Sequence, residues 1–327
     1  MKSLEEFESF YNNDLLKQLQ EIEKIRKERV KQGIVFVVGI ILTIWIVHII
    51  KINNYISTEY DWLEYVLYGV GVIITLILSL GNQKYKESYR GVFKDRIIRP
   101  IINTISEDLT YQPNGFISRD DFSKSRLFLN RIDKYSGDDL VEGKIDKTMI
   151  HFSELHAQQK QVSGSGKDRR EKWVTIFKGL FFVADFNKDF EGSTVLIPNR
   201  IGKGMSFLKK MMGANRLEKL VKLEDPEFAK NFNCYSSDDI KARYVLSPGL
   251  MHRINQFLKK YPKNSVYISF VDSHLYVAIY TGKDFFEPSY FKSVVNFDMI
   301  KSYFEDVKFV VDIVEEFNLN NRIWTKE

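Results

Sequence analysis

The residues that come closest to a known chemical motif lie in a Gly-rich turn between two predicted strands. The segment Gly164, Ser165, Gly166, Lys167 is similar to part of a phosphate-binding loop. The motif is incomplete, because Asp168 stands where a hydroxyl should bind magnesium and Gln161 stands where the first glycine is required. We therefore expect a charged hairpin tip that contacts anionic lipid or another protein. The basic residues of that tip are Lys167, Arg169 and Arg170.

The other polar candidates are explained by local structure. Pairs of adjacent acids begin at Asp120, Asp138 and Asp238, each close to a Ser or Gly in a predicted cap or turn. The five histidines are dispersed and Cys234 is the only cysteine, so no spacing resembles a zinc site. The sequence predicts no catalytic residue, no metal site and no cofactor, and it favours a protein that is not an enzyme.

Two long apolar runs, 33–50 and 62–80, predict a pair of transmembrane helices, and only Glu64 breaks the pattern. At ~1.5 Å per residue, each run is long enough to cross a hydrocarbon layer of about 30 Å. Basic residues flank the runs on their outer sides, whereas the connection 51–61 carries only Lys51. The positive-inside rule then places 51–61 outside as a short external loop and both termini in the cytoplasm. We expect a protein of the bacterial inner membrane.

The segments beside these runs are predicted to be helical. Residues 1–32 form a cytosolic amphipathic helix, and residues 81–115 form a basic juxtamembrane helix that stops at Pro100, followed by a linker. The apolar stripe of the first helix needs a cover, for which a partner helix, the cytosolic domain or a second copy would serve. Its members are Leu4, Phe7, Leu15, Leu19, Ile22 and Ile25.

Residues 116–327 predict a cytosolic α+β domain of antiparallel strands with packed helices, either as one domain or as two lobes, 116–200 and 224–327. Ser118 is expected to begin a helix whose buried side contains Phe122, Leu127 and Leu129. Alternating residues predict strands, and apolar residues at helical spacing predict helices. The expected strands are 140–161, 173–186, 195–197, 242–246, 265–270 and 275–280, and the expected helices are 201–223, 249–261 and 297–317.

The helix expected at 201–223 lies in the most basic stretch of the chain. Between Arg200 and Lys222, seven basic residues face the single acid Glu218, a local balance of plus six. A basic helix tethered near an inner leaflet can bind anionic headgroups, whereas the alternative is a helix that packs on the sheet and turns its lysines to water. The candidate lipid contacts are Lys203, Lys209, Lys210, Arg216, Lys219 and Lys222. Nucleic acid is an unlikely partner, since the domain is near neutral and carries no aromatic and basic recognition motif.

Several segments resemble a bacterial membrane-anchored family, the domain-of-unknown-function family 3137. The similar segments are 178–187, 223–228, 242–248, 269–272, 275–278 and 286–288, so the resemblance extends from about residue 85 onward. It implies a pair of membrane helices ahead of the domain, but no activity, substrate or catalytic residue. It also suggests LemA-type membrane proteins as neighbours and candidate partners.

Three functions are compatible with the sequence. The leading hypothesis is an integral inner-membrane protein whose cytosolic domain binds a partner protein, a lipid or a small ligand. The second is an enzyme that acts on lipid or envelope substrates through a site that no motif reveals. The third is a structural subunit that forms homo-oligomers through residues 1–32 and the apolar runs.

Overall fold

The computed structural model describes residues 3–52, 69, 71, 89–164, 169–186, 188–199, 218–261, 265–282, 284–317 and 319. The chain divides into two compact units. Unit 1 contains Ile101–Phe286 and Lys301–Glu327, and unit 2 contains Lys2–Pro100 and Glu287–Ile300.

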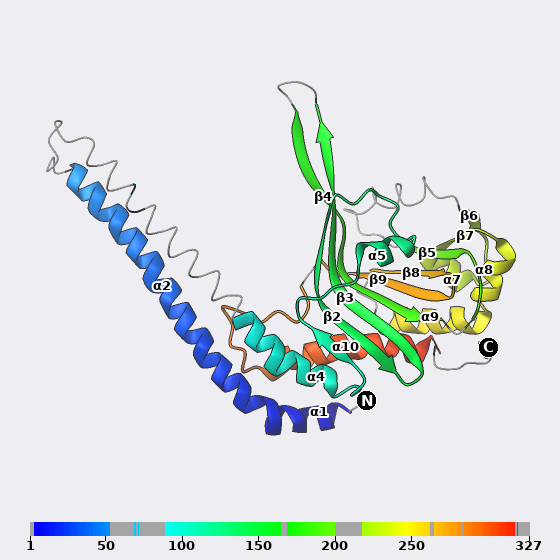
Figure 1. Ribbon diagram of the computed structural model, residues 1–327, viewed down its shortest axis with the longest axis horizontal. Helices are drawn as coiled ribbons and strands as arrows, with labels where there is room; N and C mark the ends of the chain where they lie inside the picture. Colours follow the sequence, from blue (N-terminus) through cyan, green and yellow to red (C-terminus); the bar gives the residue numbers. More distant parts are fainter. Residues whose placement is uncertain are drawn as a thin grey trace. The chain divides into compact units, whose positions relative to one another are not determined.

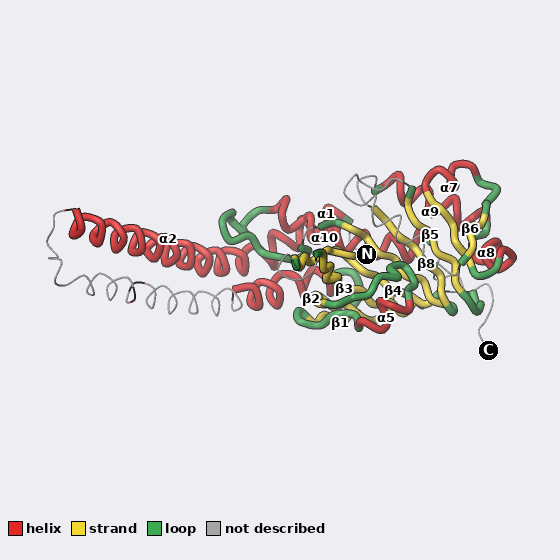
Figure 2. Tube along the Cα trace, turned by 90° about the horizontal axis from the view of Figure 1, so that it is seen from above, coloured by secondary structure: helices red, strands yellow, loops and turns green. Residues whose placement is uncertain are grey.

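Unit 1 is built on a nine-stranded sheet in which all neighbouring strands are antiparallel. The strand order is β1 (Thr110–Gln112), β2 (Lys134–Ile145), β3 (Thr148–Ser163), β4 (Arg170–Asp185), β9 (His274–Tyr280), β8 (Ser265–Val271), β5 (Ser193–Pro198), β7 (Phe232–Ser236) and β6 (Lys219–Val221). Figure 2 shows β1 and β2 at one side of the sheet and β6 at the other, and Figure 1 shows β2 and β6 at opposite sides. Strands from both predicted lobes belong to this sheet, and the α+β class is confirmed.

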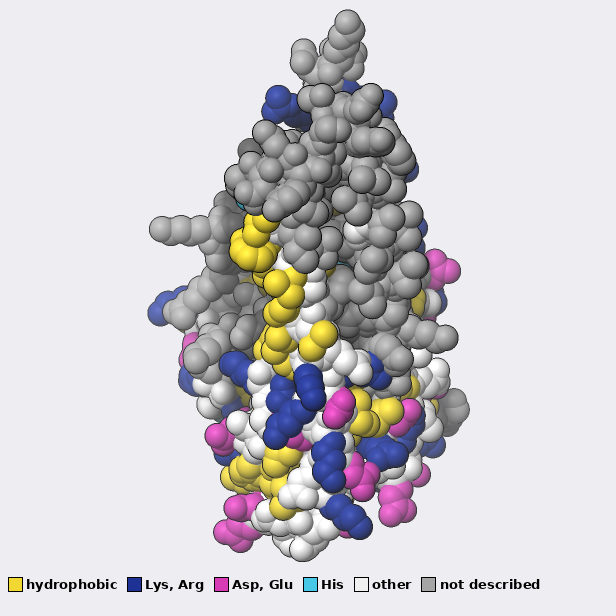
Figure 3. Space-filling view, turned by 90° about the vertical axis from the view of Figure 1, so that its left-hand side faces the viewer, with side chains coloured by type: hydrophobic (Ala, Val, Ile, Leu, Met, Phe, Trp, Pro, Cys, Tyr) yellow, Lys and Arg dark blue, Asp and Glu magenta, His cyan; other side chains and the backbone are white. Residues whose placement is uncertain are grey.

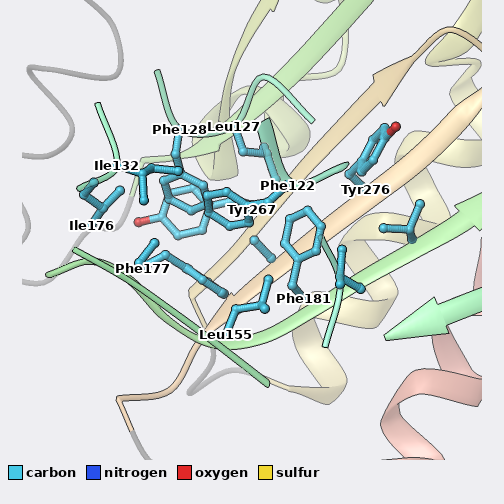
Figure 4. Close-up of a cluster of buried hydrophobic side chains, with 14 of the residues drawn as sticks. Phe122, Leu127, Phe128, Ile132, Leu155, Ile176, Phe177, Phe181, Tyr267 and Tyr276 are labelled. Carbon is cyan, nitrogen blue, oxygen red and sulfur yellow. The ribbon is translucent and has the colours of Figure 1, made fainter. Parts of the chain in front are cut away.

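One face of the sheet is covered by the segment that contains α5 (Arg119–Lys124). Ser118 caps this helix, because its hydroxyl accepts a hydrogen bond from the Asp121 amide at 3.1 Å. Phe122 and Phe128 stack on each other at 5.2 Å, and Phe122 also contacts Phe177 and Phe181 of β4. Figure 4 shows these rings meeting Tyr267 of β8 and Leu155 of β3.

The opposite face carries α9 (Pro248–Lys260) and the part of α10 (Phe297–Glu316) that lies in unit 1 (Figure 1). Phe309 of α10 packs against Phe257 at 4.9 Å and against Tyr261 at 4.3 Å. Buried Asp312 accepts a hydrogen bond from the Tyr261 hydroxyl and pairs with Lys260 at 2.6 Å. Two shorter helices, α7 (Pro226–Asn231) and α8 (Asp239–Val245), flank β7.

Unit 2 begins with three consecutive helical segments, α1 (Leu4–Phe10), the π-helix η1 (Tyr11–Leu15) and α2 (Leu16–Ile52). Side chains at three- or four-residue spacing form a buried stripe: Phe7, Tyr11, Leu15, Leu19, Ile22 and Arg26. Within the unit, segment 287–297 covers part of this stripe. Phe297 contacts Phe7 and Tyr11, and Arg26 donates to the Tyr290 carbonyl at 3.0 Å. The predicted stripe is confirmed except at Leu4 and Ile25, which are exposed.

A second helix of unit 2 is described from Tyr89 and contains the π-helix η3 (Lys94–Ile98). It continues into α4 (Arg99–Asn103), of which Arg99 and Pro100 belong to unit 2. The prediction that Pro100 ends the helix is therefore wrong. A proline ring clashes with the preceding turn and has no amide to donate, and here the wider π turn stands directly before it. Arg96 pairs with Glu21 of α2 at 3.0 Å, so this helix lies beside α2.

Within the residues that the structure describes, no helix combines the length and the apolar character that crossing a bilayer requires. The first predicted run, 33–50, lies inside α2. The second, 62–80, lies outside the described residues apart from 69 and 71. Membrane attachment therefore stays a prediction.

Three element predictions in unit 1 are wrong for local reasons. Residues 140–161 are not one strand, because Asp146 adopts a left-handed φ of 52° and turns the chain between β2 and β3. Residues 242–246 lie largely in α8, because Asp238 caps that helix through the amides of Ile240 and Lys241. The expected helix 201–223 ends in a strand, since 219–221 form β6, and residues 200–217 lie outside the described part. Leu129, expected to be buried, is exposed.

Candidate functional site

The hairpin of β3 and β4 extends beyond the rest of the sheet (Figure 1). The pairing of β2 with β3 ends at Lys134–Gln158, and that of β9 with β4 ends at Gly179–Tyr280. The pairing of β3 with β4 continues past both points to Ser163–Arg170. We call residues 158–163 and 169–175 the ribbon. Among the described residues, no further strand pairs with the outer edges of this two-stranded element over most of its length.

A β-bulge marks the base of the ribbon. The register of β3 and β4 shifts between Ala157, which pairs with Phe177, and Gln158, which pairs with Thr175. Ile176 is the extra residue, and its side chain is buried in the core cluster. A bulge increases the local twist and bends the strand that contains it, so it changes the direction of the ribbon relative to the sheet.

The two faces of the ribbon differ in their side chains. Cross-strand pairing places Lys160 opposite Trp173 and Val162 opposite Glu171, so these four side chains share one face. Trp173 is 48% exposed and Val162 is 50% exposed. Glu171 pairs with Lys160 at 2.7 Å and with Arg169 at 3.2 Å. These two ion pairs lower the pKa of Glu171.

The predicted hairpin tip is thus described in part. Arg169 precedes β4 and Arg170 is its first residue, whereas Lys167 lies outside the described residues. In the basic stretch, Lys219 lies on β6 and Lys222 follows it, both exposed. The remaining candidates Lys203, Lys209, Lys210 and Arg216 lie outside the described residues, so contact of this stretch with lipid stays a prediction.

A buried carboxyl group that no sequence pattern indicated lies on the sheet face opposite α5. Glu154 of β3 is only 6% exposed, and its Oε2 accepts a hydrogen bond from the Phe285 amide at 2.8 Å. Its carboxyl group also hydrogen-bonds that of Asp284, which pairs with Lys178 of β4 at 2.7 Å. The amides of Thr281 and Gly282 donate to the Lys178 carbonyl. These contacts hold Thr281, Gly282, Asp284 and Phe285 against β3 and β4.

Burial, together with the nearby carboxylates of Asp284 and Asp138, raises the pKa of Glu154 to about 9, although the hydrogen bond from the Phe285 amide lowers it. With this pKa the carboxyl group of Glu154 is mostly protonated at neutral pH, and its O–H can donate to the Asp284 carboxylate. His156, on the same face, has a pKa lowered by burial and by Lys178. A protonated carboxyl group beside a carboxylate, a lysine and a histidine can transfer protons, but each contact of Glu154 holds a protein segment in place. We therefore interpret the cluster around Glu154 as a structural one that holds Asp284 and Phe285 against the sheet.

The other sequence candidates have structural roles. Cys234 of β7 is buried, and burial raises the pKa of its thiol to about 12. Asp121 and Asp238 accept backbone or side-chain hydrogen bonds at helix starts. Asp139 accepts a hydrogen bond from the Tyr111 hydroxyl in the interior. His151 is largely buried, which lowers its pKa.

Sequence reasoning missed Glu154 and the exposed Trp173 for different reasons. A lone Glu within a strand carries no signal until the topology brings Asp284, about 130 residues away, onto its carboxyl group. The sequence predicts Trp173 within a strand but does not predict its exposure. Its side chain is exposed because β2 and β9 end before they reach it. The sequence feature that pointed to the ribbon was the group of charged residues in and beside the predicted turn 163–170.

Comparison with known proteins identifies one family. No curated protein and no solved structure matches the chain. The model of the family described as Protein of unknown function (DUF3137) matches residues 175–319, which run from the base of the ribbon to the end of α10. This match is narrower than the expected resemblance from about residue 85. Residues 175–319 therefore form a domain of the DUF3137 family.

Proposed function

We propose that this chain is a bacterial inner-membrane protein that acts by recognition. In this proposal the apolar runs 33–50 and 62–80 hold it in the membrane, and its α+β domain binds a partner on the cytoplasmic side. The chain contributes binding surfaces and carries out no reaction.

The surface of α2 is the observation that supports membrane attachment. The first part of the helix buries one stripe, whereas the part beyond Gly33 exposes apolar side chains that are 48–65% accessible. They are Ile34, Val35, Val37, Val38, Ile41, Leu42, Ile44 and Trp45. Figure 3 shows hydrophobic side chains in a column above a band of Lys and Arg. That pattern is typical of a helix that enters lipid beside a cytoplasmic surface.

The size of this surface makes water an unfavourable environment for it. Complete burial of one aliphatic side chain contributes about 1.5–3 kcal/mol, so eight half-exposed side chains represent on the order of 10 kcal/mol. Contiguous apolar patches of this extent are rare on soluble monomers. A bilayer covers such a surface without any specific partner.

Topology labelling tests the proposal. In cells that express the full-length chain, Asn54→Cys should react with an impermeant thiol reagent, while Ser165→Cys should react only after permeabilisation. The native Cys234 adds little background, because it is buried and its thiol pKa is about 12. The protein should also remain in the membrane pellet after alkaline carbonate extraction. Release by carbonate, or labelling of Ser165→Cys from outside, would contradict the proposal.

A further inference from the structure

We propose that the ribbon is a second membrane contact, in which Trp173 and Val162 enter the headgroup region and the nearby basic side chains bind lipid phosphates. The inference rests on the proposed function, since membrane attachment would keep the ribbon close to a bilayer. The occupant of this surface is an anionic lipid leaflet.

The first argument is the exposure of large apolar side chains on a thin element. A two-stranded hairpin has little core of its own and is marginally stable in water. The ribbon nevertheless exposes about half of Trp173 and half of Val162 on the same face. Trp is enriched at membrane interfaces, where its ring lies among acyl chains and its N–H reaches the headgroups.

The second argument is charge. The ribbon carries four basic residues, Lys160, Arg169, Arg170 and Lys172, against the single acid Glu171, a balance of plus three. Glu171 pairs with Lys160 and Arg169. Within the part of the chain that the structure describes, Arg170 and Lys172 have no ion-pair partner. Near an anionic leaflet each such cation gains about 1 kcal/mol, which converts to a roughly fivefold gain in binding.

The third argument is the arrangement of these residues. Lys160 lies on the face of Trp173, while Arg170 and Lys172 lie on the opposite face, and Arg169 stands at the end. A flat protein partner would contact one face, whereas lipid headgroups surround an element that approaches end-on. At ~3.3 Å per residue, Trp173 lies roughly 10 Å back from the last strand pair, and Val162 lies closer to the end. This spacing places Val162 deeper in the leaflet than Trp173.

Tryptophan quenching by brominated lipid tests the contact in the full-length protein. We would reconstitute the chain into vesicles of brominated phosphatidylcholine, with or without brominated phosphatidylglycerol. Subtracting the signal of Trp173→Phe removes the contribution of the other tryptophans. The quenching that is specific to Trp173 should appear on anionic vesicles, be weak on neutral vesicles, and fall as salt rises from about 0.1 M to about 1 M, where the screening length shrinks from about 10 Å to about 3 Å.

Charge-reversal variants identify the residues. Replacing Arg169, Arg170 and Lys172 by Glu should reduce the Trp173-specific quenching to the level found on neutral vesicles. A control with the same change of charge replaces the exposed lysines Lys144, Lys230 and Lys241 of unit 1 by Glu, and should leave the quenching unchanged. Circular dichroism checks that the sheet of each variant is intact.

The outcomes separate this inference from the proposed function. Flotation with neutral vesicles reports the anchor, because the ribbon requires anionic lipid. If the protein floats only with anionic vesicles, and charge reversal at the ribbon abolishes this flotation, the anchor would be refuted and the ribbon contact supported. Trp173 quenching that is absent on anionic vesicles, or equal on both lipid compositions, would overturn the inference and leave the ribbon as a surface for a protein partner.

Discussion

Replacing Glu154 by glutamine should stabilise unit 1 at neutral pH. The folded state holds Glu154 protonated with a pKa of about 9, whereas the unfolded chain ionises it with the ordinary value of 4.5. Folding at pH 7 therefore takes up a proton, at a cost of up to about 3 kcal/mol from ~1.4 kcal/mol per unit of pKa. Glutamine avoids this cost, because its carbonyl can accept from the Phe285 amide and its amide can donate to Asp284.

The sign of the pH dependence follows from the direction of the shift. Because the folded-state pKa of Glu154 is raised, its contribution to stability is fully present below pH 4.5 and is lost as the pH rises toward about 9. The wild-type chain should therefore lose stability across this window through Glu154. The gain from Glu154→Gln should be near zero at pH 4.5 and should reach about 3 kcal/mol at pH 7.

Urea unfolding in detergent micelles, followed by circular dichroism, measures both curves. Glu171→Gln is the matched control: ion pairs lower the pKa of this exposed residue, so it should give no gain that grows with pH. A Glu154→Gln variant that gains equally at pH 4.5 and 7, or is less stable than the wild type at pH 7, would refute the interpretation of Glu154 as a buried neutral acid.

Three further pairs of substitutions test the packing of the two units, each by the change in free energy of unfolding. Phe182→Asp should cost about 3–5 kcal/mol, and Phe181→Asp should cost as much because both faces of β4 are covered; a mild effect of either would show that its face is open. Tyr267→Phe should be neutral or stabilising by about 1 kcal/mol, because no described group forms a hydrogen bond with its buried hydroxyl. Tyr111→Phe should cost about 1–3 kcal/mol, because it leaves Asp139 with one hydrogen bond fewer. A large loss of stability from Tyr267→Phe would reveal a partner for that hydroxyl. Glu23→Ala should cost about 3 kcal/mol in unit 2, because it leaves Arg26 buried without the carboxylate that lies 2.6 Å away. The conservative Glu23→Gln should cost less. Equal losses from the two variants would show that the charge of Glu23 contributes nothing to stability.

The sequence predicted the elements that depend on neighbouring residues. The prediction of the β8–β9 hairpin was correct, because Asp272 and Ser273 adopt the positive φ values that a tight turn requires. The α9 and α10 helices were correct because apolar residues recur at helical spacing over more than three turns. At Asp238 the capping side chain favoured a helix, and the alternation of residues 242–246 was misleading. At Pro100 the local signal was itself misleading, because the helix continues through the proline.

Tertiary structure alone decided which side chains are unusual. Residues 154 and 284 meet because antiparallel strands place distant segments side by side, and burial then turns an ordinary glutamate into a neutral acid. The exposure of Trp173 depends on where β2 and β9 stop, which its own neighbours do not encode. The segment 287–297 covers part of the N-terminal stripe through two contacts. Phe297 packs against Phe7 and Tyr11, and the Tyr290 carbonyl accepts a hydrogen bond from Arg26. Local sequence thus determined most of the helices and strands, and long-range packing determined which side chains are buried, paired or exposed.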